Sequence, residues 1–179
     1  MKKLLFIAIS FFLLNSFSIE KDERIEWRED RKLTWADFKG APDEDTPYAA
    51  ITASGLYHEF SGKIRAGKVT YNSKVVCYFH PQDSWYKKEM ASENLLAHEQ
   101  LHFDISELHA RQLRKAIQAF NFTKNMQSEM DALYKKANSD MKAMQTRYDN
   151  EVDFSLNKEQ QKAWQIKIQK ELQRLVAYK

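Results

Sequence analysis

Glycine, proline and cysteine are scarce in this sequence of 179 residues, and the few that occur divide it into two unlike parts. All 4 glycines and all 3 prolines lie before residue 82. The only cysteine, Cys77, excludes an internal disulfide, so oxidation does not stabilise the fold. The length favours one domain. We therefore expect a single domain over 19–179, with a β-rich part over 19–90 and a helical part over 91–179.

A large excess of charge of either sign is also missing. The sequence has 28 lysines and arginines against 25 aspartates and glutamates, which gives a net charge of +3. Lys2 and Lys3 supply two of these positive charges, and basic and acidic residues are interspersed along the rest. Because nucleic-acid binding usually needs a basic face, we expect no nucleic-acid partner.

No apolar run is long enough for a comfortable membrane span. The run Leu4–Leu14 follows two lysines and precedes the small residues Ser16 and Ser18. This order is typical of a secretory signal peptide cleaved after Ser18. We therefore predict a signal peptide over 1–18 and an exported chain, periplasmic or extracellular, with no stable membrane span after cleavage. An uncleaved anchor is the alternative.

The pattern of apolar residues changes along the chain. Between residues 24 and 80, short apolar stretches alternate with glycines, and the region 69–77 shows the period-two spacing of strands. From residue 91 the spacing is helical, and it predicts helices over about 92–120, 125–148 and 158–177, with Ser92 and Asn157 as caps. The fold class is therefore predicted as α+β, a small N-terminal antiparallel β-rich unit packed on three long helices.

The first predicted helix carries the motif His98-Glu99-Gln100-Leu101-His102. Residues four apart on a helix differ by about 40° in rotation and about 6 Å in rise, so His98 and His102 project from one face and can share one Zn²⁺. Glu99 lies about 100° around the helix, where it can act on the metal's water without binding the metal. This geometry is the reason that the H-E-x-x-H pattern supports zinc-dependent hydrolysis on a zincin-like active-site helix.

A catalytic zinc normally has three protein ligands. On the same helix, His109 lies about 10 Å along the axis from His102, and Asp104 and Glu107 face elsewhere. If the chain reverses near 121–125, the second helix brings positions 144–148 opposite the two histidines, and the acidic stretch that begins there offers Asp149 or Glu151 as the third ligand. We favour Asp149 and keep Glu151 as the alternative.

Several stretches resemble a bacterial family of secreted proteins, the domain of unknown function 922, which is usually described as zinc-dependent proteases. They are LTWADFKGAP (33–42), YAAITASGL (48–56), SWYKKE (84–89), LLAHEQLHFDISELHARQLRK (95–115), YDNEV (148–152) and NKEQQKAW (157–164). The resemblance implies that His98 and His102 bind zinc and that Glu99 is the catalytic acid/base. It covers nearly the whole chain after the signal peptide.

The family also has a downstream pattern, Tyr-Asp-x-Glu-Thr-x-His. This sequence matches it at Tyr148, Asp149 and Glu151 and departs from it at Val152 and Phe154. Phe154 stands where histidine is usual, and the metal site survives this change if Asp149 is the third ligand. A tyrosine at 148 is placed to donate a hydrogen bond to a developing oxyanion.

These features predict an exported zinc-dependent metallopeptidase that acts on a peptide or protein substrate. Glu99 serves as the general base, Tyr148 as the oxyanion donor, and His98, His102 and Asp149 as the Zn²⁺ ligands. Two alternatives stay open: a zinc-binding but inactive envelope protein that serves as a binding module, and a purely structural helical adaptor.

Overall fold

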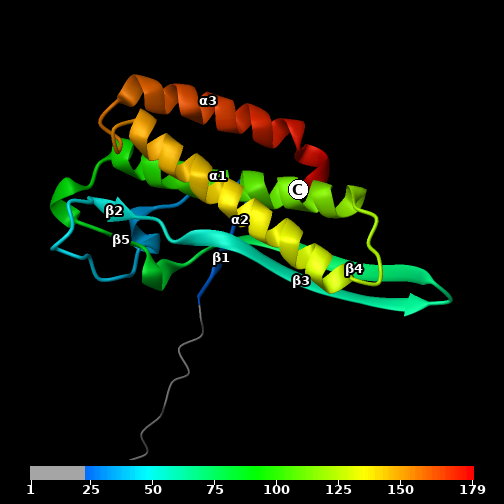
Figure 1. Cartoon of the computed structure of the whole chain (residues 1–179). Coiled ribbons are helices and arrows are strands. Elements are labelled where there is room, and N and C mark those ends of the chain that lie inside the picture. The colour runs from blue at the N-terminus through cyan, green and yellow to red at the C-terminus, as the bar shows by residue number, and fades with distance from the viewer. Residues whose placement is uncertain (1–22) are drawn as a thin grey trace, which may run out of the picture.

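The computed structural model describes residues 23–179, so the predicted signal peptide over 1–18 lies outside the described residues. The N-terminal part forms two small antiparallel sheets (Figure 1). In one, β4 (Lys68–Phe79) pairs on one side with β3 (Ser54–Arg65) and on the other with β1 (Ile25–Glu26). In the other, β2 (Ala50–Ile51) pairs with β5 (Trp85–Tyr86).

The β3–β4 hairpin turns on two residues, Ala66 and Gly67. Their φ angles are +48° and +77°, the left-handed pair that a two-residue hairpin turn with the correct twist needs. From this turn the register runs from Arg65 opposite Lys68 to Ser54 opposite Phe79. The tight turn therefore fixes which side chains of both strands face the helices.

The helical part agrees with the prediction, with small differences at the helix ends. Helix α1 spans Glu93–Ala119, α2 spans Met126–Glu151 and α3 spans Lys158–Arg174, and a 3-10 turn follows over Val176–Tyr178. The side chains of Ser92 and Asn157 cap α1 and α3, because they accept hydrogen bonds from Leu95 N at 3.1 Å and Gln160 N at 3.0 Å.

Helix α1 forms the centre of the molecule. It contacts β3 and β4 on one side and α2 and α3 on the other, so the α+β architecture is confirmed (Figure 1). Its residues Ile105 and Leu108 are fully buried, and the Cys77 thiol on the inner face of β4 donates to Phe103 O at 4.0 Å. Each such aliphatic side chain contributes about 1.5–3 kcal/mol by leaving water. The helix that carries the H-E-x-x-H motif therefore packs against both the strands and the other two helices.

Candidate metal centre

Helix α1 brings the two motif histidines together, as the four-residue spacing predicts. His98 is 4% exposed, and its Nε2 lies 3.2 Å from Nε2 of His102. Both imidazoles present the same nitrogen to the same point. A buried imidazole next to a half-buried one in this arrangement needs a partner that accepts or neutralises their polar nitrogens.

Asp149, near the C-terminal end of α2, supplies that partner. Its Oδ1 lies 2.9 Å from His102 Nε2 and 3.3 Å from His98 Nε2. The chain reverses between Phe120 and Asn125, and α2 returns antiparallel along α1, which is the hairpin geometry inferred from the sequence. The residues predicted as the ligand set are thus the ones that the structure brings together, and they are the only such group found among residues 23–179.

The spacing of these three atoms fits a zinc ion. A tetrahedral site with bonds of about 2.0–2.1 Å holds its ligand atoms about 3.3 Å from one another. The three separations here are 2.9, 3.2 and 3.3 Å. Two imidazoles and one carboxylate are also the donor types that zinc accepts with one position left open. The residues therefore fit the metal that the motif implies.

Without a metal, the same atoms form a charge-assisted cluster. Burial raises the pKa of Asp149, but hydrogen bonds from His102 and His98 outweigh burial and bring the pKa to about 2. Burial lowers the pKa of His102, but its hydrogen bond to Asp149 and the charge of Glu99 outweigh this and raise that pKa. The cluster thus favours an ionised carboxylate beside a protonated imidazole, and a metal would replace that proton.

Tyr148 holds the imidazoles by packing. Its ring is fully buried, stacks on His98 at a centroid distance of 4.7 Å and meets His102 edge-on at 5.2 Å, with Trp164 behind it at 5.5 Å. Its hydroxyl and His98 Nδ1 are buried without a hydrogen-bond partner among residues 23–179. Packing rather than outer hydrogen bonds therefore orients His98. Tyr148 does not line the cleft described next, so its role as an oxyanion donor stays a prediction.

The cluster opens onto a cleft of about 1180 Å³. His98, His102, Asp149 and Glu99 all line it. Glu99 is only 3% exposed, and its backbone carbonyl accepts a hydrogen bond from Thr52 Oγ1 at 3.3 Å. The motif glutamate therefore lies at the cleft wall next to the two histidines.

Two contacts that the sequence did not predict fix α1 and α2 beside the cluster. Gln145 Nε2 donates to His102 O at 3.4 Å and to Ser106 Oγ at 3.1 Å, and Ser106 also pairs with Ser54 of β3 at 2.8 Å. Gln145 also lines the cleft. Gln145 lies one turn before Asp149 on α2. The sequence could therefore have predicted Gln145 near the cluster once the register of α2 against α1 was known.

Two other polar residues of α1, His109 and Asp104, have hydrogen-bond partners outside the cluster. His109 Nδ1 donates to Ile105 O at 2.9 Å within its own helix. Asp104 accepts hydrogen bonds from Trp27 at 2.7 Å and Gln100 at 2.8 Å. These groups face away from the metal centre.

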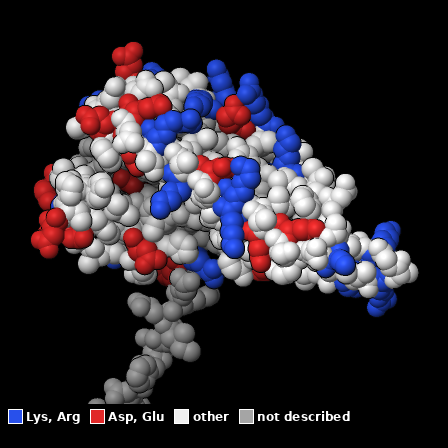
Figure 2. All heavy atoms as spheres, viewed as in Figure 1, with Lys and Arg blue, Asp and Glu red and all other residues white. Residues whose placement is uncertain are grey.

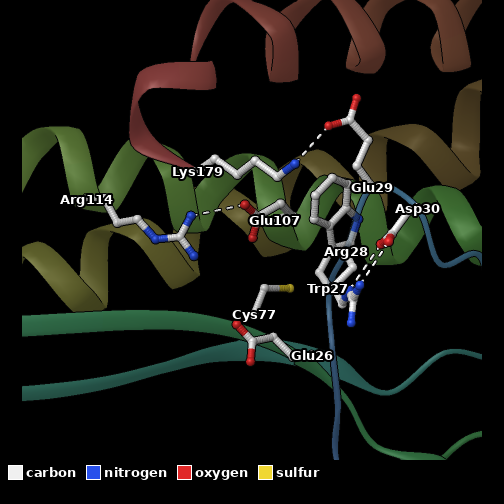
Figure 3. A pocket seen from close by; sticks show the side chains of 9 residues that line it. All are labelled: Glu26, Trp27, Arg28, Glu29, Asp30, Cys77, Glu107, Arg114 and Lys179. Atoms are coloured by element: carbon white, nitrogen blue, oxygen red, sulfur yellow. Dashed lines mark hydrogen bonds and ion pairs between the residues drawn. The ribbon is translucent and has the colours of Figure 1, made fainter.

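Glu107 lies in a separate pocket, between α1 and the sheet. Its carboxylate accepts hydrogen bonds from Arg111 at 2.9 Å and Arg114 at 3.0 Å, and Figure 3 shows it pointing toward Arg114 beside Cys77. Burial raises the pKa of the Cys77 thiol. The cluster fixes the C-terminal half of α1 to the strands and has no part in the metal centre.

Glu151, the alternative third ligand, is directed elsewhere. Its Oε2 accepts a hydrogen bond from Trp164 Nε1 at 2.8 Å, which joins α2 to α3. Two residues along a helix correspond to about 200° of rotation, so Asp149 and Glu151 cannot both face α1. The two remaining histidines, His58 of β3 and His80 just after β4, do not belong to the metal group, and the ring of His58 lies against Tyr134 at a centroid distance of 4.2 Å.

The segment after α2 carries the departures from the family pattern. Val152 is fully buried, whereas Phe154 is 49% exposed and packs against Tyr48 at a centroid distance of 6.0 Å. The residues 153–155 have φ angles of +48°, +48° and +79°, which cost L-residues energy. Asn94 Nδ2 ties this strained turn to α1 by donating to Ser155 O at 2.7 Å. Phe154 thus forms part of the cleft rim.

The fold and the site define an α+β protein in which two histidines of an H-E-x-x-H helix and one carboxylate of the next helix form a cluster. Residues 79–155 match the model of a family described as a bacterial protein of unknown function, DUF922. This segment contains α1, α2 and the whole cluster, and the match supports the resemblance found in the sequence. No curated protein and no solved structure matches the chain.

Proposed function

We propose that this protein is an exported zinc-dependent metallopeptidase that hydrolyses bonds of a peptide or protein substrate. The observation that carries the proposal is the convergence of His98 Nε2, His102 Nε2 and Asp149 Oδ1, 2.9–3.3 Å apart, at the wall of a large cleft. A structural zinc site would normally be closed by a fourth protein ligand, whereas three ligands and an open side are typical of catalytic sites.

The roles of the residues follow from their positions. Zinc bound at these three residues would lower the pKa of a water toward about 7 and polarise a substrate carbonyl. Glu99 would accept the proton of that water and later transfer it to the leaving amine. The hydrogen bond from Thr52 to the Glu99 backbone carbonyl supports this role, because it restrains the residue at the cleft.

The cleft has features that suit an extended peptide. Residues 47–52 line it and include β2, which pairs with β5 on one side only among the described strands. A substrate segment can add to the other edge through backbone hydrogen bonds. The rim carries four exposed apolar side chains, and these favour substrates with large apolar residues near the cleaved bond: Tyr48, Met90, Phe154 and Leu156.

The metal part of the proposal is tested by elemental analysis of the purified chain after zinc reconstitution. We expect close to one zinc per chain, and a loss of most of it in His98→Gln and in His102→Gln. His80→Gln is the matched control, since it removes a histidine outside the group and should keep the metal. Zinc below about a tenth of an equivalent in the parent protein would refute the metal centre.

The catalytic part is tested by a comparison of the parent protein with Glu99→Gln on a mixed peptide library. Removal of a general base typically slows hydrolysis by about 10²–10⁴-fold, while the zinc content should not change. Glu93→Gln is the control, because it is the same substitution at the start of the same helix and cleft. Equal cleavage by the parent and by Glu99→Gln would show that the activity comes from another source.

One observation favours a second candidate, a zinc-binding envelope protein that binds a partner without hydrolysing it. Phe154 occupies the position where the resembled family has histidine, and its phenyl ring cannot bind a metal or a transition state through a polar atom. This candidate predicts full zinc content with no Glu99-dependent hydrolysis. A purely structural adaptor predicts instead that zinc leaves the stability of the protein unchanged.

A further inference from the structure

The β3–β4 hairpin extends beyond the part of the molecule that the helices cover (Figure 1). At Gly62 it still touches α2, since a Cβ there would lie 2.3 Å from Met126 Sδ. Beyond that point residues 63–68 are all exposed. A two-stranded hairpin is marginally stable by itself, so packing within the fold does not explain this length. We call residues 61–74 the hairpin end.

The hairpin end has a strongly one-sided charge. Its 14 residues include four cations and no acid, whereas the whole chain has a net charge of only +3. The cations are Lys63, Arg65, Lys68 and Lys74. All are exposed, and Figure 2 shows Lys and Arg side chains gathered at this end of the molecule. The chain therefore has a local basic surface, although its net charge as a whole is small.

The strand register separates charge from apolar surface. Arg65 is opposite Lys68, and Lys63 lies two residues before Arg65, so these three cations share one face of the hairpin end. On the other face, Ile64 is 45% exposed, whereas its partner Val69 is half-buried and packs against the core. The tip thus carries three cations on one face and an exposed apolar side chain, Ile64, on the other.

We propose that the hairpin end docks on the surface of an anionic lipid bilayer. The cations would contact headgroup phosphates, while Ile64 enters the boundary between headgroups and acyl chains. Charge complementarity carries the choice of an anionic surface, and the exposed Ile64 side chain favours lipid over nucleic acid. Single-stranded nucleic acid would need a free aromatic ring for stacking, but Tyr71 donates its hydroxyl to Ile117 O at 3.1 Å and is held against α1.

This docking would orient the molecule. The hairpin tip and the β2–β5 sheet, which borders the cleft, lie at opposite ends of the molecule (Figure 1). The bilayer would therefore hold the protein by one end and leave the cleft open to soluble or membrane-attached chains. Docking does not depend on zinc or on hydrolysis, so it can be tested independently of the proposed function.

The test is co-sedimentation of the full chain with vesicles. The measured quantity is the ratio of binding to vesicles of phosphatidylcholine mixed with phosphatidylglycerol to binding to vesicles of phosphatidylcholine alone. This ratio cancels any contribution of the N-terminal residues that does not depend on lipid charge. Each basic residue near an anionic surface contributes about 1 kcal/mol, about a fivefold change in binding. We expect the ratio to fall by about a hundredfold in the triple variant Lys63→Glu, Arg65→Glu, Lys68→Glu, and to fall as salt is added.

The matched control is Lys135→Glu, Lys162→Glu, Lys170→Glu on exposed positions of α2 and α3, which changes the net charge by the same amount. Glutamine at the three hairpin positions is a second variant that avoids new negative charge, and circular dichroism verifies that each variant is folded. Equal losses in hairpin and control variants would overturn the proposal. So would tighter binding to a DNA duplex than to the mixed vesicles, because any polyanion would then suffice.

Discussion

The substitution Asp149→Asn tests the metal centre most directly. It keeps the shape of the side chain and one oxygen acceptor, but it removes the charge that lies 2.9 Å from His102 and 3.3 Å from His98. In the metal-free protein, the fall of the Asp149 pKa from 3.8 to about 2 corresponds to at most about 2.5 kcal/mol of stability at neutral pH. The variant should therefore be less stable even without zinc.

The decisive quantity is the change that zinc produces in each protein. Zinc at about 100 times its Kd stabilises the folded state by about 2.7 kcal/mol, which raises the Tm of a domain of this size by about 5–11 °C. Loss of a residue that only orients a metal ligand lowers the affinity for the metal by about 10–100-fold. Loss of the ligand itself should therefore lower that affinity by at least about 100-fold. At the same zinc concentration, Asp149→Asn should then gain only about 0.4 kcal/mol, or about 1–2 °C.

The assay is a thermal scan of each protein with a chelator and with excess zinc. Glu151→Gln is the control, because it makes the same chemical change two residues further on, in a side chain that bonds to Trp164 instead. We expect it to keep the full zinc-induced rise. If Asp149→Asn keeps that rise, or if Glu151→Gln loses it, the assignment of the third ligand is wrong.

Three further predictions concern pH, the cleft rim and the core. With a chelator present, the His102–Asp149 pair stabilises the folded protein most between roughly pH 4 and 6.5. Below this range the contribution is lost because Asp149 is protonated, and above it the contribution is lost because His102 loses its proton. The increase in the urea midpoint that zinc produces should instead become larger from about pH 6 to 8, because imidazoles must be neutral to bind a metal. If the metal-free stability and the zinc-induced increase changed with pH in the same direction, zinc would not bind at the His102–Asp149 pair. Tyr48→Ala and Phe154→Ala should each lower kcat/KM for peptides with large apolar residues by about 2–10-fold and leave charged peptides unaffected. Ile105→Ala, at a fully buried position of α1, should lower the free energy of unfolding by about 2–5 kcal/mol in urea titrations.

The helical part illustrates what local sequence patterns can decide. The absence of glycine and proline after residue 82, together with caps at Ser92 and Asn157, predicted α1 and α3 with nearly correct N-terminal ends. The C-terminal end of α1 at Ala119 was also predicted closely, but α3 ends at Arg174, before the predicted position 177, and passes into a 3-10 turn over Val176–Tyr178. Helix starts have side-chain signals, whereas these helices end without a glycine to mark the last turn.

The metal cluster shows how far helix geometry extends beyond one element. A fixed rise and rotation per residue placed His98 and His102 on one face, and the same rise along an antiparallel hairpin placed the stretch from Tyr148 onward opposite them. It left Asp149 and Glu151 as alternatives. The choice depends on the rotation of α2 about its own axis, which distant contacts set: Gln145 to Ser106 on α1, and Glu151 to Trp164 on α3.

The sequence by itself thus determined the fold class, the helices and the identity of the two histidines, because these follow from periodicities within single elements. Only the tertiary structure decided that Asp149 faces them, that Tyr148 is buried behind them, and that Phe154 lies on the cleft rim. It also decided that the cations of the β3–β4 hairpin gather on one exposed tip. These features depend on how separate elements are rotated and packed against one another, and no local spacing in the chain encodes that.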